Sequence, residues 1–182
     1  MPPSVARNEE KKNESRPPRR DGPIRAKDEP ILLTKPKIME PTYTQLYIHF
    51  VFSVKKRNPL ITENIRPRLQ RYITGLMQKR GNKMLSIYCM PDHCHILIGW
   101  NPEYSISQLM KEVKSYSSKW VNKNQLAKER FYWQQGYGAF SCAKDAISTI
   151  GNYIDHQPHR HKTISFHDEY NRLLEDHGII PK

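Results

Sequence analysis

Two histidines separated by one residue, His93 and His95, stand near the middle of the chain. They lie in an apolar run, 88–100, whose β-branched residues favour a buried strand. Alternate residues of a strand point to the same face, so we expect the two imidazoles to project side by side. A single histidine in such a strand is usually a hydrogen-bonded core residue. A pair at this spacing instead favours a site for a metal cation or a phosphate.

A tyrosine and a glutamine four residues apart, Tyr153 and Gln157, form the second informative pattern. On one helix they would lie on the same face, beside the apolar stripe of Ile147, Ile150 and Ile154. A phenol is a possible nucleophile, and an amide oxygen is a possible third metal ligand. Taken alone, the pair is more often a core-edge tyrosine and a surface amide.

Together the two patterns indicate chemistry at phosphorus. Two imidazoles and an amide leave coordination positions on a metal open, as a catalytic site requires, and a scissile phosphate can fill them. Attack by a tyrosine gives a phosphotyrosine linkage, which retains the energy needed to rejoin strands. Free tyrosine has a pKa near 10, so it needs a nearby cation to become nucleophilic. Imidazole ligands suit Mn, Zn or Ni better than Mg.

Alternating strands and helices are expected to position these residues. Strands are predicted at 45–54, 84–90, 93–100 and 136–141. Helices are predicted from a cap at Asn64 to Gly81, from the capping box Ser105-x-x-Gln108 onward, around Tyr153, and over 165–174. The simplest packing of this order is an antiparallel sheet with helices against one face.

The first 41 residues differ in composition from the rest. Eight of the fourteen prolines fall there, aromatic residues are absent, and ten basic residues face seven acidic ones. Such a segment cannot bury enough apolar surface to offset its chain entropy. We therefore expect residues 1–41 to form a disordered, proline-rich basic tail, and residues 42–182 to form the folded domain.

The net charge of +12 and the pI near 9.7 favour nucleic acid as the partner, ahead of an anionic membrane surface. No apolar run approaches the roughly 18 residues of a membrane span, and the first thirty residues lack the apolar core of a signal peptide. Three irregularly spaced cysteines fit a reducing compartment, so a cytoplasmic location is expected.

A second basic stretch offers a surface for single strands, because phosphate contacts combined with base stacking are the usual way to hold them. The alternative reading is a solvated helix face above a core stripe. The candidate DNA-binding residues are Lys111, Lys114, Lys119, Lys123 and Arg130, with Tyr116 and Trp120 between them.

The motifs together resemble the HUH-tyrosine transposases of the insertion sequence 200/605 family, which include the REP-associated tyrosine transposases as relatives. The resemblance rests on Pro91-Asp-His-Cys-His-Ile-Leu97, on 132–141, and on Tyr153 with Gln157, and it runs from about 43 to 180. Two positions depart from the family pattern. Cys94 replaces a bulky hydrophobic residue, and Pro158 follows the glutamine.

The resemblance implies an α+β, ferredoxin-like (RRM-like) fold, commonly assembled as a homodimer. It implies a transposase that binds DNA hairpins and cuts and rejoins single-stranded DNA through a 5′-phosphotyrosine intermediate. Tyr153 would be the nucleophile, and His93, His95 and Gln157 would hold Mg²⁺ or Mn²⁺. In many members the tyrosine of one subunit serves the histidine pair of the other.

Three alternatives remain open. A domesticated relative could bind hairpins without moving DNA. A metal hydrolase could use the histidine pair while Tyr153 is structural. A non-catalytic nucleic-acid-binding module would stack bases on an open sheet face, where only Tyr47 and His49 of the first strand are expected to be free.

Overall fold

The structure is a computed structural model that describes residues 42–180. The expected disordered tail, 1–41, lies outside the described residues. The elements, in chain order, are β1 (Tyr47–Ser53), a 3₁₀ turn η1 (Lys55–Arg57), α1 (Arg66–Lys79), β2 (Lys83–Cys89), β3 (His93–Gly99), α2 (Ile106–Lys123), β4 (Gly138–Cys142), α3 (Ile147–Asp155), α4 (Gln157–Arg160) and α5 (Phe166–Asp176).

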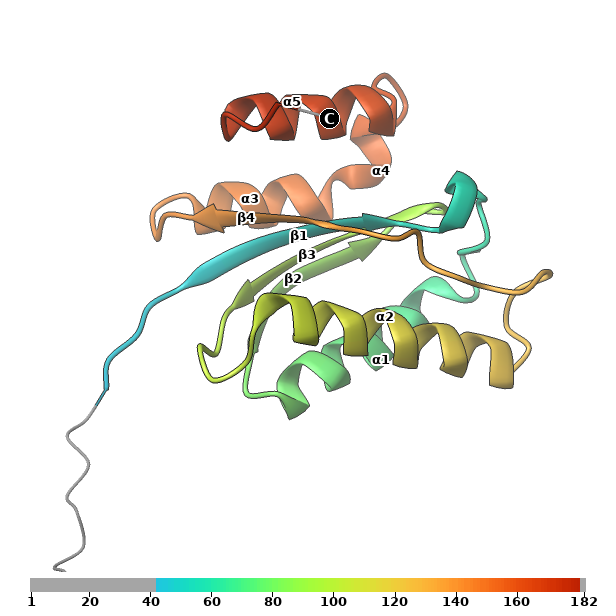
Figure 1. Cartoon of the computed structure of the whole chain (residues 1–182). Coiled ribbons are helices and arrows are strands. Elements are labelled where there is room, and N and C mark those ends of the chain that lie inside the picture. The colour runs from blue at the N-terminus through green and yellow to red at the C-terminus, as the bar shows by residue number, and fades with distance from the viewer. Residues whose placement is uncertain (1–41, 181–182) are drawn as a thin grey trace, which may run out of the picture. The chain divides into compact units, whose positions relative to one another are not determined.

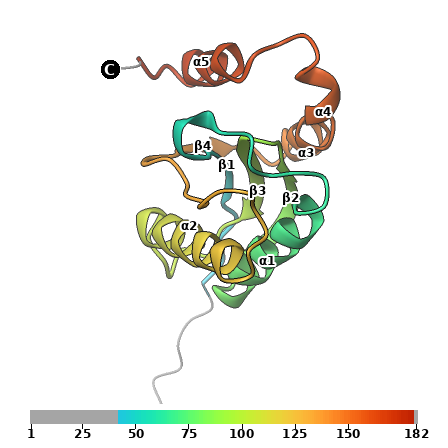
Figure 2. The ribbon, with the colours of Figure 1, turned by 90° about the vertical axis from the view of Figure 1, so that its right-hand side faces the viewer.

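Four strands form one antiparallel sheet in the order β2-β3-β1-β4. With the chain order β1-α1-β2-β3-α2-β4, this is the ferredoxin-like arrangement, which confirms the predicted fold class. Helices α1 and α2 cover one face, as expected, while α3, α4 and α5 lie over the other (Figures 1 and 2). The expectation of helices on one face is therefore met by α1 and α2, but it did not include the helices on the opposite face.

Side-chain alternation in the two central strands builds the core on the α1 and α2 side. Phe50 and Phe52 of β1 and Ile96 and Ile98 of β3 are buried there against both helices. The residues between them in sequence project toward the opposite face, beneath α3 and α5. The two faces of β1 and β3 therefore have different roles, since one packs the core and the other carries the histidines.

The boundaries of α1 differ slightly from expectation. Asn64 was predicted to cap this helix, but the N-cap is Ile65, and no side chain caps it. Pro67 lies in the first turn, where its missing N–H costs little. Gly81, at φ 74°, ends the helix as predicted, in a conformation that favours glycine.

Serine caps start the other two long helices. The Ser105 hydroxyl accepts the backbone N–H of Gln108, which confirms one half of the predicted capping box, but the Gln108 amide reaches Glu112 rather than the cap. Ser165 caps α5 in the same way, by accepting the backbone N–H of Asp168. This cap orients α5 above the sheet.

The helix that carries Tyr153 ends before Gln157, so the prediction that one helix carries both residues is wrong. Helix α3 ends at Asp155, and α4 starts at Gln157. Pro158 has no N–H to donate to the carbonyl of Ile154, which prevents α3 from continuing. The two side chains still meet, by a different geometry described below.

Within residues 42–180, no helix combines the length and apolar character that crossing a membrane requires.

Candidate active site

The histidine pair lies on β3 as predicted. Opposite it on β1, His93 pairs in register with Ser53 and His95 with Val51. Both imidazoles are buried, with exposed fractions of 1% and 0%. Cys94, between them, points into the core on the other face, where its Sγ lies 2.9 Å from that of Cys89. The small residue at this departure from the family pattern is therefore a packing feature.

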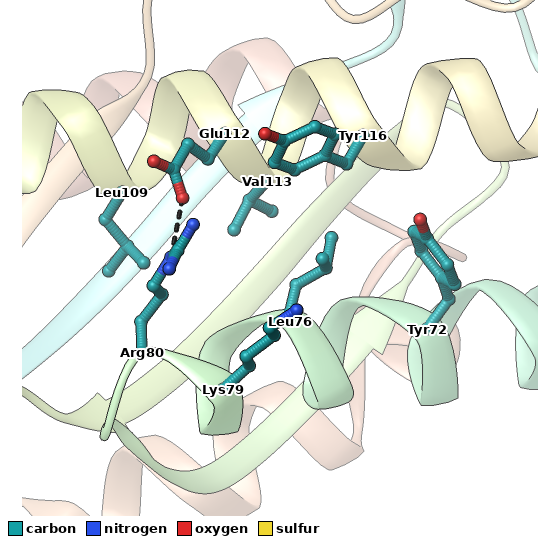
Figure 3. A pocket seen from close by; sticks show the side chains of 8 residues that line it. All are labelled: Tyr72, Leu76, Lys79, Arg80, Leu109, Glu112, Val113 and Tyr116. Atoms are coloured by element: carbon teal, nitrogen blue, oxygen red, sulfur yellow. Dashed lines mark hydrogen bonds and ion pairs between the residues drawn. The ribbon is translucent and has the colours of Figure 1, made fainter.

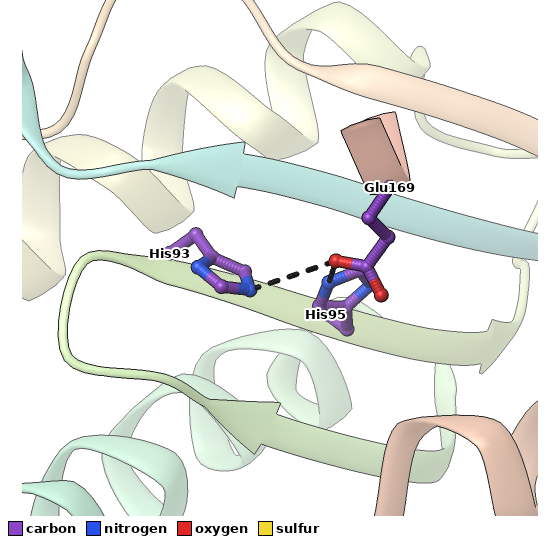
Figure 4. Close-up of side chains that lie close together, drawn as sticks. All are labelled: His93, His95 and Glu169. Carbon is purple, nitrogen blue, oxygen red and sulfur yellow. Dashed lines mark ion pairs between the residues drawn. The ribbon is translucent and has the colours of Figure 1, made fainter. Parts of the chain in front are cut away.

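A carboxylate that the sequence analysis did not identify completes the cluster. Glu169 of α5 reaches down onto the two histidines of β3 (Figure 4). Its Oε2 lies 3.4 Å from His95 Nε2 and 3.9 Å from His93 Nε2. One ligand atom from each of the three residues falls within 4.8 Å of the others, so this buried group could hold a metal ion.

Three buried polar atoms at this point have no hydrogen-bond partner: His93 Nε2, His95 Nε2 and Gln157 Oε1. Leaving such atoms unpaired is costly, and a bound cation would satisfy them. All three can present a lone pair to a cation. Each of the three residues predicted as metal ligands therefore presents an unpaired buried atom, and their role as ligands stays a prediction.

Gln157 is held in place by its amide group. Its Nε2 donates to Glu169 Oε1 at 2.7 Å, and its side chain is buried at the start of α4. This hydrogen bond leaves the amide oxygen as the unpaired atom.

Tyr153 reaches the same carboxylate from α3. Its hydroxyl donates to Glu169 Oε1, its ring stands edge-on to His95, and the Arg160 guanidinium lies 4.5 Å from the ring centroid. Burial, followed by the Glu169 contact, raises the pKa of Tyr153 above its ordinary value. The phenol is therefore neutral in this arrangement, and an added cation would be needed to favour the phenolate.

Glu169 collects donors from several directions. Its Oε2 accepts a hydrogen bond from His161 Nε2 at 2.9 Å. Its Oε1 accepts the hydrogen bonds from Tyr153 and Gln157. Burial alone would raise its pKa, but the hydrogen bond from His161 and the nearby His95 imidazole lower it well below the usual range. The carboxylate is therefore charged, and a negative charge beside two imidazoles favours a cation.

A second set of contacts fixes His93. The Asp92 carboxylate lies 2.7 Å from His93 Nδ1, and Arg57 donates to the other oxygen of Asp92. Arg57 is itself held against the ring of Phe166, with 3.9 Å between the guanidinium and the ring centroid. Because Nδ1–H donates to Asp92, His93 Nε2 keeps the lone pair that a metal requires.

We expect Arg57→Ala and Asp92→Ala to weaken Mn²⁺ binding by about 10- to 100-fold, the usual effect of losing such an outer partner. Without them, His93 can turn and exchange tautomers. Asp92→Asn keeps an acceptor for Nδ1–H and should be milder. Isothermal titration with Mn²⁺ measures the affinities, and Arg71→Ala, an exposed arginine of α1, is the control. Equal affinities for Arg57→Ala and Arg71→Ala would contradict this role.

The sheet face that carries the site is covered. His49, on β1 beside His95, is only 3% exposed, and its ring stacks on that of His95 with 5.3 Å between centroids. The prediction that His49 is free to stack on bases is therefore wrong, because α3 and α5 lie above it. This covering removes the support for a nucleic-acid-binding module that uses an open sheet face.

Buried histidines make stability depend on pH. Burial lowers the pKa of His93 from 6.5 to about 4, against the opposing effect of the hydrogen bond with Asp92, and burial together with the charge of His95 lowers the pKa of His49 from 6.5 to about 3. Between the ordinary and the lowered values the unfolded chain binds more protons than the folded one. Stability is therefore lost as the pH falls through this window.

We expect the metal-free protein to lose about 2 kcal/mol of unfolding free energy between pH 7 and pH 5 through His93 alone. Urea denaturation at the two pH values, with a chelator present, measures this loss. His93→Gln should reduce the difference by that amount, and His159→Ala, which removes an exposed histidine, should not. A pH difference that His93→Gln leaves unchanged would contradict the assignment.

The predicted DNA-binding residues fall into separate groups. Lys111, Lys119 and Arg130 are exposed and line a groove of about 660 Å³ between α2 and the segment 130–137. Lys123 is exposed on the same helix but does not line this groove. The sequence could not separate these lysines, because all of them are polar positions of one helix.

Lys114 has a structural contact instead. It is half-buried, and its Nζ donates to the backbone carbonyls of Gln134 and Gly136. Burial lowers the pKa of this amine. Lys114 therefore anchors the segment that forms the far wall of the groove.

The two aromatic residues expected to stack on bases face the other helix. Trp120 is already stacked on Tyr72 of α1, with 4.6 Å between ring centroids and an interplanar angle of 12°. Tyr116 lies at a hollow of about 250 Å³ between α1 and α2, which also contains the ion pair of Arg80 with Glu112 (Figure 3). The role expected for Trp120 is therefore corrected, since its ring packs the two helices together.

Comparison of the sequence with known proteins gives consistent matches. The sequence model of the family described as "Transposase IS200 like" matches residues 42–157. The chain is 25% identical over 119 residues to the ISDra2 transposase TnpA of Deinococcus radiodurans, covering 62% of this chain and 84% of that protein. It is 26% identical over 114 residues to the transposase for insertion sequence element IS200 of Salmonella typhimurium, covering 60% and 74%.

Two solved structures share the fold. One is a crystal structure of a candidate transposase from Deinococcus radiodurans R1, with a TM-score of 0.53 and 20% identity over 65% of this chain and 95% of that one. The other is a REP-associated tyrosine transposase bound to a REP hairpin, with a TM-score of 0.52 and 15% identity over 69% and 74%. Glu169 lies beyond the segment that the family model matches.

Proposed function

The chain belongs to the IS200-like transposase family, and from that premise we propose that it cuts and rejoins single-stranded DNA by transesterification. Tyr153 is the nucleophile, and His93, His95 and Gln157 hold a divalent metal. The observation that carries the proposal is the meeting of three unpaired buried ligand atoms with the Tyr153 hydroxyl around one carboxylate, Glu169.

The donor set fits a divalent cation. Two imidazole nitrogens and an amide oxygen are buried without partners, and the charged Glu169 lies close to both histidines. Mg²⁺ or Mn²⁺ is the expected ion, and the imidazoles favour Mn²⁺. When bound, such an ion neutralises charge developing on a scissile phosphate.

The residues of this chain then divide the chemical step. The Tyr153 oxygen forms a bond to phosphorus while the bond from phosphorus to the 3′ oxygen breaks. Glu169 accepts the hydrogen bond of the phenol and holds its oxygen in place, and the phenol proton passes to water. The 3′ oxygen leaves as a hydroxyl after taking a proton from water, and the 5′ phosphate stays on Tyr153. Attack by a 3′ hydroxyl reverses these steps and rejoins the strand.

DNA hairpins are the proposed recognition element. The REP-associated relative is described as bound to a REP hairpin, and the net charge of +12 suits any DNA partner. A homodimer is proposed from the family resemblance. Within the chain described here, Tyr153 lies beside the histidines of the same subunit, so the first turnover can be tested without exchange of α3 between subunits.

The test is product analysis with the full chain. The substrate is labelled single-stranded DNA carrying the palindromes that flank the gene, incubated with Mn²⁺. A labelled band that stays on the protein in denaturing gels supports transesterification. Cleavage to free ends with no such band would support a metal hydrolase instead. Hairpin binding with neither product would support a domesticated binding protein.

A further inference from the structure

The groove beside α2 shares Arg130 and Tyr132 with a second hollow, which is lined by Lys55 and Lys56 of the turn η1. We propose that this groove, with Tyr132 at its edge, binds the single-stranded DNA that enters the active site. The inference rests on the proposed function for the identity of that strand. The sequence analysis assigned DNA binding to the whole basic helix. The groove instead assigns it to Lys111, Lys119 and Arg130 and excludes Lys123.

Charge complementarity favours a polyanion in the groove. Its lining includes Lys111, Lys119 and Arg130, and no aspartate or glutamate contributes to it. The hollow between α1 and α2 differs, since its Glu112 forms an ion pair with Arg80 at 2.7 Å. The groove therefore presents positive charge that no lining carboxylate neutralises.

Tyr132 supplies a stacking surface at the edge of this charge. Its side chain is 42% exposed, and it stands between the groove and a second hollow of about 240 Å³. Arg130 lies 5.4 Å from its ring centroid on one side, and the Lys55 amine lies 5.8 Å from it. An exposed ring flanked by cations can stack on a base while the cations contact the adjoining phosphates.

The backbone connects this edge to the active site. The N–H of Lys55 donates to the Tyr132 carbonyl at 2.8 Å, and the N–H of Val54 donates to the Asp92 carbonyl at 2.7 Å. Asp92 in turn holds His93. Tyr132 is therefore connected to His93 through Lys55, Val54 and Asp92.

The turn η1 between these points has an unusual backbone. Lys56 and Arg57 both have a φ of 58°, in the left-handed region that non-glycine residues seldom adopt. Such strain persists where surrounding contacts hold it, and it concentrates at functional sites. Here it leaves Lys55 and Lys56 exposed while Arg57 reaches back to Asp92. The turn thereby continues the positive surface from the groove to the site.

Unpaired bases fit this surface better than a duplex. Stacking on Tyr132 requires a base whose face is accessible, and bases inside a duplex present only their edges. The occupant is therefore the single-stranded segment next to the hairpin rather than the hairpin stem.

The experiment measures binding of a fluorescein-labelled single-stranded oligonucleotide of about 15 nucleotides by anisotropy, with full-length protein and no divalent metal. Tyr132→Leu should weaken binding by about 5- to 100-fold, and Tyr132→Phe should bind as the parent does. The matched control is Tyr116→Leu, because Tyr116 is also 42% exposed but does not line the groove. Equal affinities for Tyr132→Leu and Tyr116→Leu would overturn the proposal.

A charge comparison gives a second, independent readout. Lys119→Ala should reduce the slope of binding against salt by about 0.7, the value for one phosphate contact on a single strand. Lys123→Ala, outside the groove on the same helix, should leave the slope unchanged. Neither change touches the core, so both variants test the proposal even if Tyr132→Leu folds poorly. Equal slopes for the two variants would place the strand elsewhere.

Failure of this proposal is distinct from failure of the proposed function. A protein that forms the Tyr153 adduct but binds single strands equally well with Tyr132→Leu would retain the function and lose the groove. A protein that forms no adduct, yet loses single-strand affinity only with Tyr132→Leu and Lys119→Ala, would retain the groove. A duplex that binds more tightly than the single strand and responds to the same changes would also overturn the proposal.

Discussion

Tyr153→Phe is expected to reduce the covalent protein–DNA adduct below detection while leaving hairpin binding intact. Phenylalanine keeps the ring that stands beside His49 and His95 and lies 4.5 Å from Arg160, but it lacks the oxygen that would bond to phosphorus. The measurement is the yield of labelled protein in a denaturing gel after incubation with hairpin DNA and Mn²⁺. An adduct of normal yield would remove Tyr153 from the chemical step.

The control for this change is Tyr170→Phe. Tyr170 is a half-buried tyrosine of α5 that stacks on Phe166, so it tests loss of a nearby hydroxyl without touching the proposed nucleophile. Tyr153→Phe also removes one hydrogen bond to Glu169, which should cost about 1 to 3 kcal/mol of stability. A melting curve for each variant therefore accompanies the adduct assay, so that a folding defect is recognised.

The strand pattern around His93 and His95 was sufficient to predict their shared face and burial. Period-two alternation in the central strands divides core from site, and the α1 and α2 stripes provide the helices that cover the core. Local signals also served well where they are self-contained, as at Ser105 and Gly81. These features depend on residues that are close in sequence, so they could be predicted from the sequence alone.

Glu169 was not predicted, because its importance depends on where α5 docks. One signal was present, however. Phe166, Tyr170 and Leu173 form the apolar stripe of α5, and Glu169 falls within the same stripe. An acid in the buried face of a short helix requires partners, so it was a candidate ligand on physical grounds. Its partners, on β3 and α3, could not be named without the fold.

The contacts of Arg57 and the break before Gln157 escaped prediction for a related reason. Arg57 lies 35 residues from Asp92 in sequence, and nothing local marks the pair. The break was signalled by Pro158, but the convergence of Tyr153 and Gln157 after it depends on α4 turning back over the sheet. When a site takes its residues from several helices and strands, the sequence shows each residue separately but not that they meet.

The histidine pair should be indispensable for the metal. We expect His93→Ala and His95→Ala each to abolish cleavage and to weaken Mn²⁺ binding by at least about 100-fold, because one imidazole and an amide cannot hold the ion by themselves. Isothermal titration gives the affinity without requiring any activity. His156→Ala is the control, since that exposed histidine bonds only to the carbonyl of Asn152 among the described residues.

Two further variants separate the remaining ligands. Gln157→Ala should be milder than either histidine change, because a water or a nearby histidine can replace an amide oxygen. Glu169→Gln keeps the size of the side chain and removes its charge. If Glu169 binds the ion directly, this change should weaken Mn²⁺ binding about as much as His95→Ala does. If Glu169 only orients the Tyr153 hydroxyl, affinity should persist while adduct formation is lost. Cleavage that survives a chelator, or full Mn²⁺ affinity in His93→Ala, would show that the pair is not a metal site.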